Sequence, residues 1–130
     1  MDYRLPKNER LHSKKLIKEL FDKGSSFFLY PFKVLYLSLE DDSETNQVLF
    51  SVSKRKIKKA VGRNYIKRRM REAYRLNKSL LLDGENKKKL IAFVYVSSER
   101  ESFQAIEPKM KKILKRLAAP REKNSKRDEE

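Results

Sequence analysis

The sequence predicts a single α+β domain. Apolar residues recur at helical spacing in some stretches and alternate with polar residues in shorter ones, which is typical of helices and strands in one chain. The 130 residues suit one domain, and 38% apolar against 39% charged residues predicts a small core. We place the domain at residues 1–118 and expect the polar, mixed-charge segment 119–130 to be a disordered tail.

The first predicted helix lies in SKKLIKELFDKG. Ser13 suits the cap before its first turn, and Gly24 suits its end. Four apolar residues between them share one helical face: Leu16, Ile17, Leu20 and Phe21.

Two predicted strands follow, PFKVLYLSL (31–39) and QVLFSVS (47–53). In the first strand, Phe32, Val34 and Tyr36 share one face. The other face carries Lys33, Leu35 and Leu37. The acidic segment between the strands reads as a solvated turn rather than a metal site. We therefore expect an antiparallel hairpin of these two strands.

The next segment, KRKIKKAVGRNYIKRRMREAYR (54–75), contains eleven Lys or Arg and one acid, and so supplies +10 of the formal net charge of +15. Helical spacing gives it a largely apolar stripe of Ile66, Met70, Ala73, Tyr74 and Asn77. The opposite face is a polar row, about 16 Å long at 1.5 Å rise per residue. The residues of this polar row are Asn64, Lys67, Arg68, Arg71 and Arg75.

A third strand is predicted in KLIAFVYVS (89–97). The closing helix should bury Met110, Ile113, Leu114 and Leu117. Because proline is tolerated in the first turn of a helix, Pro108 predicts that the regular part begins near Glu107, with Phe103 and Ile106 docking the approach.

Composition excludes several function classes. The absence of Cys excludes disulfides and a thiolate nucleophile, and the single His12 excludes a His-based metal cluster. No apolar run of membrane-spanning length and no signal-like start is present, so we expect a cytoplasmic protein that does not enter a membrane. No catalytic residue and no metal site is predicted.

The polar row has two readings. A charge run is usually a solvated surface whose side-chain stems cover apolar neighbours. Here one continuous basic face lies opposite one apolar face with almost no acid, which favours contact with nucleic-acid phosphates. Structured RNA suits the chain better than duplex DNA because no helix-turn-helix partner is visible. Aromatic residues in the strands would stack on unpaired bases, although core packing claims about half of them.

The segment VSKRKIKKAVGRNYIKRRMREAY resembles the signature of the bacterial ribonuclease P protein, in which a strand ending in Ser-Lys runs into an Ala-Val-x-Arg-Asn-Arg-x-Lys-Arg-x-x-Arg-Glu helix. The order of elements is similar over nearly the whole chain. Tyr65 stands in place of the last arginine of Arg-Asn-Arg, Ile17 replaces a common aromatic of the leading helix, and one extra residue lies between Lys54 and Ala60.

This resemblance implies a two-layer α-β sandwich with helices packed on a small sheet and a left-handed βαβ crossover. It also implies a catalytic RNA partner that removes the 5′ leader of precursor tRNA with Mg²⁺ held through the RNA, and no protein partner. The residues that would dock this RNA are Lys54, Arg63, Asn64, Lys67, Arg68, Arg71 and Arg75. A cleft between the first helix and the sheet would hold the leader, and the candidates for it are Phe21, Phe32, Tyr36 and Tyr95.

Two other hypotheses compete with this one. A ribosomal or other structural RNA-binding protein would show the same basic helix without a role in any reaction. A protein-only nuclease would need clustered carboxylates to hold metal ions.

Overall fold

The computed structural model describes residues 5–39, 45–82 and 88–118. The predicted tail at 119–130 lies outside these ranges. Three helices and three strands match predicted segments, whereas η1, β1 and α3 were not predicted. In chain order the elements are η1 (Lys7–Glu9), α1 (Lys14–Lys23), β1 (Ser25–Leu29), β2 (Phe32–Ser38), β3 (Gln47–Val52), α2 (Ala60–Asn77), α3 (Ser79–Leu82), β4 (Lys89–Tyr95) and α4 (Phe103–Ala118).

The four strands form one sheet in the order β1-β2-β4-β3. The predicted hairpin of β2 with β3 is wrong, because β4 lies between them. The antiparallel partners of β2 are β1 and β4, and β3 pairs with β4 in parallel. Alternation shows which side chains of a strand share a face, but it does not identify the neighbouring strands.

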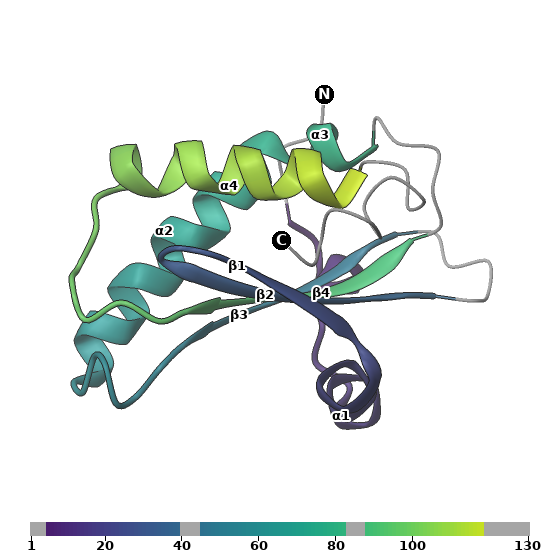
Figure 1. The fold of residues 1–130 in the computed structure, drawn as a ribbon, viewed down its shortest axis with the longest axis horizontal. Coiled ribbons are helices and arrows are strands. Elements are labelled where there is room, and N and C mark those ends of the chain that lie inside the picture. Colours follow the sequence, from purple (N-terminus) through teal and green to yellow (C-terminus); the bar gives the residue numbers. More distant parts are fainter. Residues whose placement is uncertain (1–4, 40–44, 83–87, 119–130) are drawn as a thin grey trace.

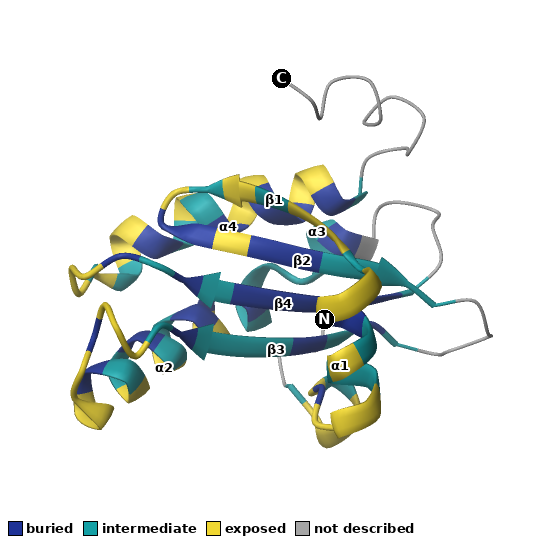
Figure 2. Ribbon diagram, turned by 60° about the horizontal axis from the view of Figure 1, so that its bottom comes forward, coloured by how far each residue is buried: buried dark blue, intermediate teal, exposed yellow. Residues whose placement is uncertain are grey.

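The parallel strands β3 and β4 are joined by α2 and α3. In Figure 2 the sheet is seen from the side of α1, and this connection passes behind the sheet. The crossover is left-handed, as the resemblance implies, and is therefore an exception to the usual right-handed rule.

Helices cover both faces of the sheet unequally. α2 and α4 lie side by side over one face, and α1 packs alone on the other, which is called the α1 face below (Figure 1). The larger core lies under α2 and α4 and includes Phe32, Phe93, Ile66, Met70 and Leu114. A smaller cluster lies under α1 and consists of Leu11, Leu20, Leu35, Leu90 and Ala92. The α-β sandwich is thus confirmed.

Helix α1 has the predicted ends. The Ser13 hydroxyl accepts a hydrogen bond from the Leu16 N–H at 3.2 Å, and the Gly24 N–H donates to the Leu20 carbonyl at 2.9 Å. A Cβ atom at Gly24 would lie 2.9 Å from the backbone oxygen of Tyr36. The absence of a side chain at residue 24 therefore lets α1 end directly against β2.

Helix α4 begins earlier than predicted. It starts at Phe103, so the prediction of a start near Glu107 is wrong. The Ser102 hydroxyl accepts a hydrogen bond from the Ala105 N–H at 3.2 Å and supplies the cap. Pro108 lies inside the helix on its exposed side.

Candidate nucleic-acid interface

Helix α2 carries the polar row on its solvent side. Its buried residues are Gly62, Ile66, Met70, Ala73 and Tyr74, which confirms the predicted stripe. On the other side Asn64, Arg68 and Arg71 are exposed, and Lys67 and Arg75 are half-buried. The 18-residue helix therefore presents the row as one surface, while its opposite side is fixed against the sheet.

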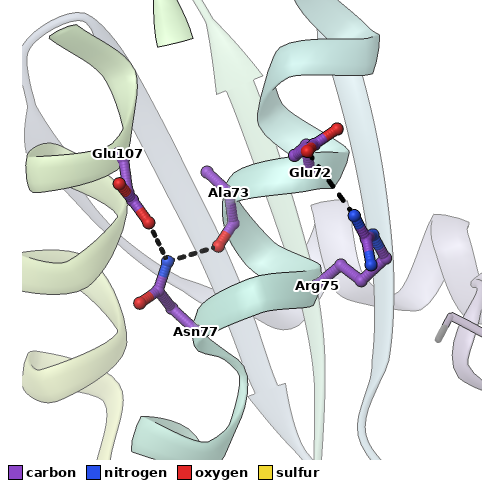
Figure 3. A network of polar contacts seen from close by, with 5 residues as sticks. All are labelled: Glu72, Ala73, Arg75, Asn77 and Glu107. Carbon is purple, nitrogen blue, oxygen red and sulfur yellow. Dashed lines mark hydrogen bonds and ion pairs between the residues drawn. The ribbon is translucent and has the colours of Figure 1, made fainter. Parts of the chain in front are cut away.

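Few carboxylates neutralise the polar row. Glu72 lies 3.5 Å from the Arg75 guanidinium (Figure 3), and such a surface pair contributes little to stability. Within the described ranges, no ion pair involves Lys67, Arg68 or Arg71. Because like charges at these spacings repel one another in a helix, the row costs stability that a bound polyanion would offset.

Arg63 holds the connection into α2. Its Nη1 donates hydrogen bonds to the carbonyl oxygens of Ile57 at 3.0 Å and Lys58 at 2.6 Å. These bonds tie the loop after β3 to the first turn of α2. Lys54 of the same loop is exposed. Among the predicted RNA-docking residues, Arg63 thus has a structural role that Lys54 does not share.

The last turn of α2 is joined to α4 by a side chain (Figure 3). The Asn77 amide nitrogen donates to the Ala73 carbonyl at 2.8 Å and to the Glu107 carboxylate at 2.9 Å. These bonds explain a polar residue at the end of the apolar stripe. They also fix the polar row relative to α4.

Two of the four aromatic leader candidates are core residues. Phe32 and Tyr95 are fully buried beneath α2 and α4, with ring centroids 5.8 Å apart. The Tyr95 hydroxyl donates to the Glu99 carbonyl and accepts from the Glu101 N–H at 3.2 Å, and burial raises the pKa of this hydroxyl. Neither ring is accessible to a base, which corrects their assignment to a leader cleft.

The other two candidates lie on opposite faces of the sheet. Tyr36 is half-buried in the core under α2 and α4, where its ring centroid is 5.9 Å from that of Phe27. Phe21 is 48% exposed near the end of α1. Along β2, the residues that face α1 are the alternate ones, such as Lys33 and Leu35. The sheet surface beside α1 is therefore lined by these residues and not by Tyr36.

Two exposed aromatic residues were missed together with β1. Phe28 is 59% and Tyr30 53% exposed, with ring centroids 6.3 Å apart. Phe28 pairs with the exposed Lys33, which pairs with Val94 of β4. This row crosses the α1 face, and α1 covers only one end of that face (Figure 2). The signal in the sequence is the apolar run FFLY, which follows the first helix after three small residues.

The two surfaces suit different features of an RNA. The polar row offers guanidinium, ammonium and amide donors for a phosphate backbone. The open part of the α1 face offers aromatic rings and a lysine, which suit unpaired nucleotides. In the described ranges no three His, Asp or Glu side chains are grouped to hold a metal ion. No helix in those ranges has the length and apolarity needed to cross a membrane.

The comparisons with known proteins agree with one another. The family model described as ribonuclease P matches residues 5–118. Over 118 residues the chain is 42% identical to the ribonuclease P protein component of Porphyromonas gingivalis strain ATCC 33277, covering 88% of this chain and 86% of that protein. It is 37% identical over 115 residues to that of Chlorobium phaeobacteroides, covering 79% of this chain and 78% of that protein.

Solved structures show the same fold. The ribonuclease P protein from Thermotoga maritima superposes with a TM-score of 0.70 at 28% identity, covering 85% of this chain and 99% of that chain. The Staphylococcus aureus protein gives a TM-score of 0.68 at 24% identity, covering 82% of this chain and 93% of that chain, a likeness that concerns the fold alone.

Proposed function

Because the chain belongs to the ribonuclease P protein family, we propose that it binds the catalytic RNA of ribonuclease P through the polar row of α2 and promotes removal of the 5′ leader from precursor tRNA. The observation that carries this proposal is the exposed row itself, in which Arg68 and Arg71 form no ion pair within the described ranges. Guanidinium groups at helical spacing bind successive phosphates, and the Asn64 amide can donate to a sugar hydroxyl or a base edge.

The single-stranded leader is assigned to the open part of the α1 face. Phe28 offers an exposed ring there, and Lys33 lies beside it in the sheet register. Phe21 offers a second exposed ring near the end of α1. Aromatic rings stack on any base and a lysine contacts any phosphate, so this surface would bind leaders of different sequence. The catalytic RNA and the leader then contact different sides of the protein.

The bond-breaking chemistry is assigned to the RNA and its Mg²⁺. Mg²⁺ prefers oxygen ligands such as carboxylates, whereas the two surfaces of this chain gather cations and aromatic rings. These residues do not fit a dedicated magnesium site. The protein would supply binding and positioning, and no residue is given a catalytic role. The cytoplasmic location expected from the sequence stays a prediction.

Reconstitution tests the proposal. The purified protein is added to catalytic RNA and precursor tRNA at a Mg²⁺ concentration at which the RNA alone cleaves slowly. We expect faster release of the leader, because neutralised phosphates let the RNA and its substrate associate with fewer metal ions. Unchanged cleavage would refute the function.

The same assay separates the competing hypotheses. A structural RNA-binding protein would bind the RNA and leave the cleavage rate unchanged. A protein-only nuclease would cleave precursor tRNA in the absence of the RNA. We expect the protein alone to leave precursor tRNA intact after repeated purification.

A further inference from the structure

A tyrosine on the flank of α2 holds two arginine side chains. The Cζ atom of Arg69 lies 4.3 Å from the centroid of the Tyr65 ring, and that of Arg100 lies 5.3 Å from it. Arg69 is one turn further along α2, whereas Arg100 comes from the segment between β4 and α4. The half-buried ring packs against the larger core and is therefore fixed in place. It brings together guanidinium groups from two separate parts of the chain.

Gly62 lies beside the second arginine. A Cβ atom at residue 62 would lie 3.4 Å from Nε and 3.5 Å from Nη2 of Arg100, and 2.8 Å from Cγ2 of Ile57. The Arg100 guanidinium thus lies against the backbone of the first turn of α2. The two distances to Arg100 are ordinary van der Waals contacts, whereas the contact with Ile57 would be too close for a Cβ atom, so it is Ile57 that favours a glycine here.

Glu99 and Glu101 flank Arg100 in the sequence, but neither forms an ion pair with it within the described ranges. No ion pair there involves Arg69 or Arg100. The N-cap residue of α2 is Lys59, and the first turn contains no acid. The two cations on one ring repel one another, and Arg100, which lies against the first turn of α2, is also repelled by the positive end of the helix dipole. A bound anion would relieve both effects.

We propose that Arg69 and Arg100, held on Tyr65, form a phosphate-binding site that extends the polar row to the flank of α2. Its ligand would be a backbone phosphate of the catalytic RNA, and this identity rests on the proposed function. Tyr65 is also the position at which this chain departs from the Arg-Asn-Arg of the signature it resembles. The guanidinium at this place comes instead from Arg100, on a different element.

Inorganic phosphate tests the site without any RNA. In NMR spectra of the free protein, the Hε protons of Arg69 and Arg100 are expected upfield because they lie near the Tyr65 ring. Added phosphate should shift both signals together, and should leave the Hε signal of Arg10, an exposed arginine of the N-terminal segment, unchanged. Arg69 and Arg100 signals that do not respond to phosphate would overturn the proposal.

Affinity for the catalytic RNA tests whether this phosphate-binding site contacts that RNA. Arg100→Ala should bind about tenfold more weakly. Its slope of log affinity against log salt should be shallower by about 0.7 to 0.9, the contribution of one phosphate. Tyr65→Leu removes no charge and should still weaken binding to a similar extent, whereas Tyr65→Phe keeps the ring and should bind like the parent.

Arg10→Ala is the matched control, because it removes the same charge from an exposed position outside the site. It should bind within about twofold of the parent, as expected for a screened surface charge. Equal losses in Arg10→Ala and Arg100→Ala would overturn the site, since net charge alone would then explain both. Thermal unfolding checks that each variant is folded. If Tyr65→Leu is not folded, the RNA affinity of Arg100→Ala tests the site, because Arg100 is exposed.

The outcomes separate this site from the proposed function. If the parent protein does not bind the catalytic RNA, the proposed function fails and the phosphate titration alone decides the site. If the parent binds but Arg100→Ala and Tyr65→Leu bind equally well, the site is wrong and the proposed function stands.

Discussion

At the scale of single residues, the position on α2 decides what an arginine does. Arg63 donates two hydrogen bonds to backbone carbonyls of the loop before the helix. Arg68 is exposed and has no ion pair in the described part of the chain. The same side chain thus supports the fold at one position and is available to RNA at the other, and a pair of variants distinguishes the two roles.

Arg68→Ala should weaken binding to the catalytic RNA and change the free energy of unfolding by no more than about 0.5 kcal/mol, because it removes an exposed charge. Arg63→Ala should lower the free energy of unfolding by about 1 kcal/mol, because two carbonyls lose a donor. Filter binding and thermal unfolding measure the two effects. An unchanged RNA affinity of folded Arg68→Ala would contradict the docking model.

Aromatic residues on the two faces of the sheet should also differ. Phe28→Ala removes an exposed ring and should weaken the binding of precursor tRNA with a leader by about 1–3 kcal/mol. The binding of mature tRNA should not change. Tyr36→Ala should instead lower the midpoint of thermal unfolding, because its ring packs against Phe27 and the core. If folded Phe28→Ala prefers precursor tRNA over mature tRNA as strongly as the parent protein does, the leader does not lie on this face.

At the scale of elements, the end of α1 depends on one close contact. In Gly24→Ala the new Cβ would lie 2.5 Å from the Leu20 carbonyl oxygen and 2.9 Å from that of Tyr36. Both neighbours are backbone atoms, so α1 must shift on the sheet. We expect a loss of about 1–3 kcal/mol in the free energy of unfolding. The exposed Ser25→Ala is the control, and equal midpoints in denaturant for the two variants would contradict this account.

The sequence allowed α1, α2 and α4 to be predicted because each buries one stripe at helical spacing. It also allowed the two faces of β2 to be separated. It did not show which face meets α1, because both faces are covered and both carry apolar residues. Phe32 and Tyr95 were therefore given to the wrong surface. The site formed by Tyr65 and Arg100 joins residues 35 positions apart, which no local pattern brings together.

At the scale of the whole molecule, residues 54–75 supply +10 of the net charge of +15. Sulfate should therefore raise the midpoint of thermal unfolding more than chloride does at equal ionic strength, because bound anions favour the folded state. The increase should be smaller in Arg68→Ala. Equal midpoints in the two salts would show that repulsion in this segment does not limit stability.

Salt should weaken RNA binding steeply. With five cations in contact with phosphates, log affinity should fall with log salt with a slope of about −3.5 to −4.5. These cations are Lys54, Lys67, Arg68, Arg71 and Arg75. A slope near zero, measured by titration at several salt concentrations, would exclude docking through phosphates.

The strand order also fixes when the chain can fold during synthesis. β4 lies between β2 and β3 but is made after both and after α2. A nascent chain that ends at residue 88 has the basic segment but lacks the strand that joins β3 to the hairpin of β1 and β2. We expect protease to cut within residues 60–77 of such a ribosome-bound chain and to spare them once residue 118 has emerged. The segment proposed to bind RNA is therefore among the last parts of the chain to become ordered, although it is not among the last to be made.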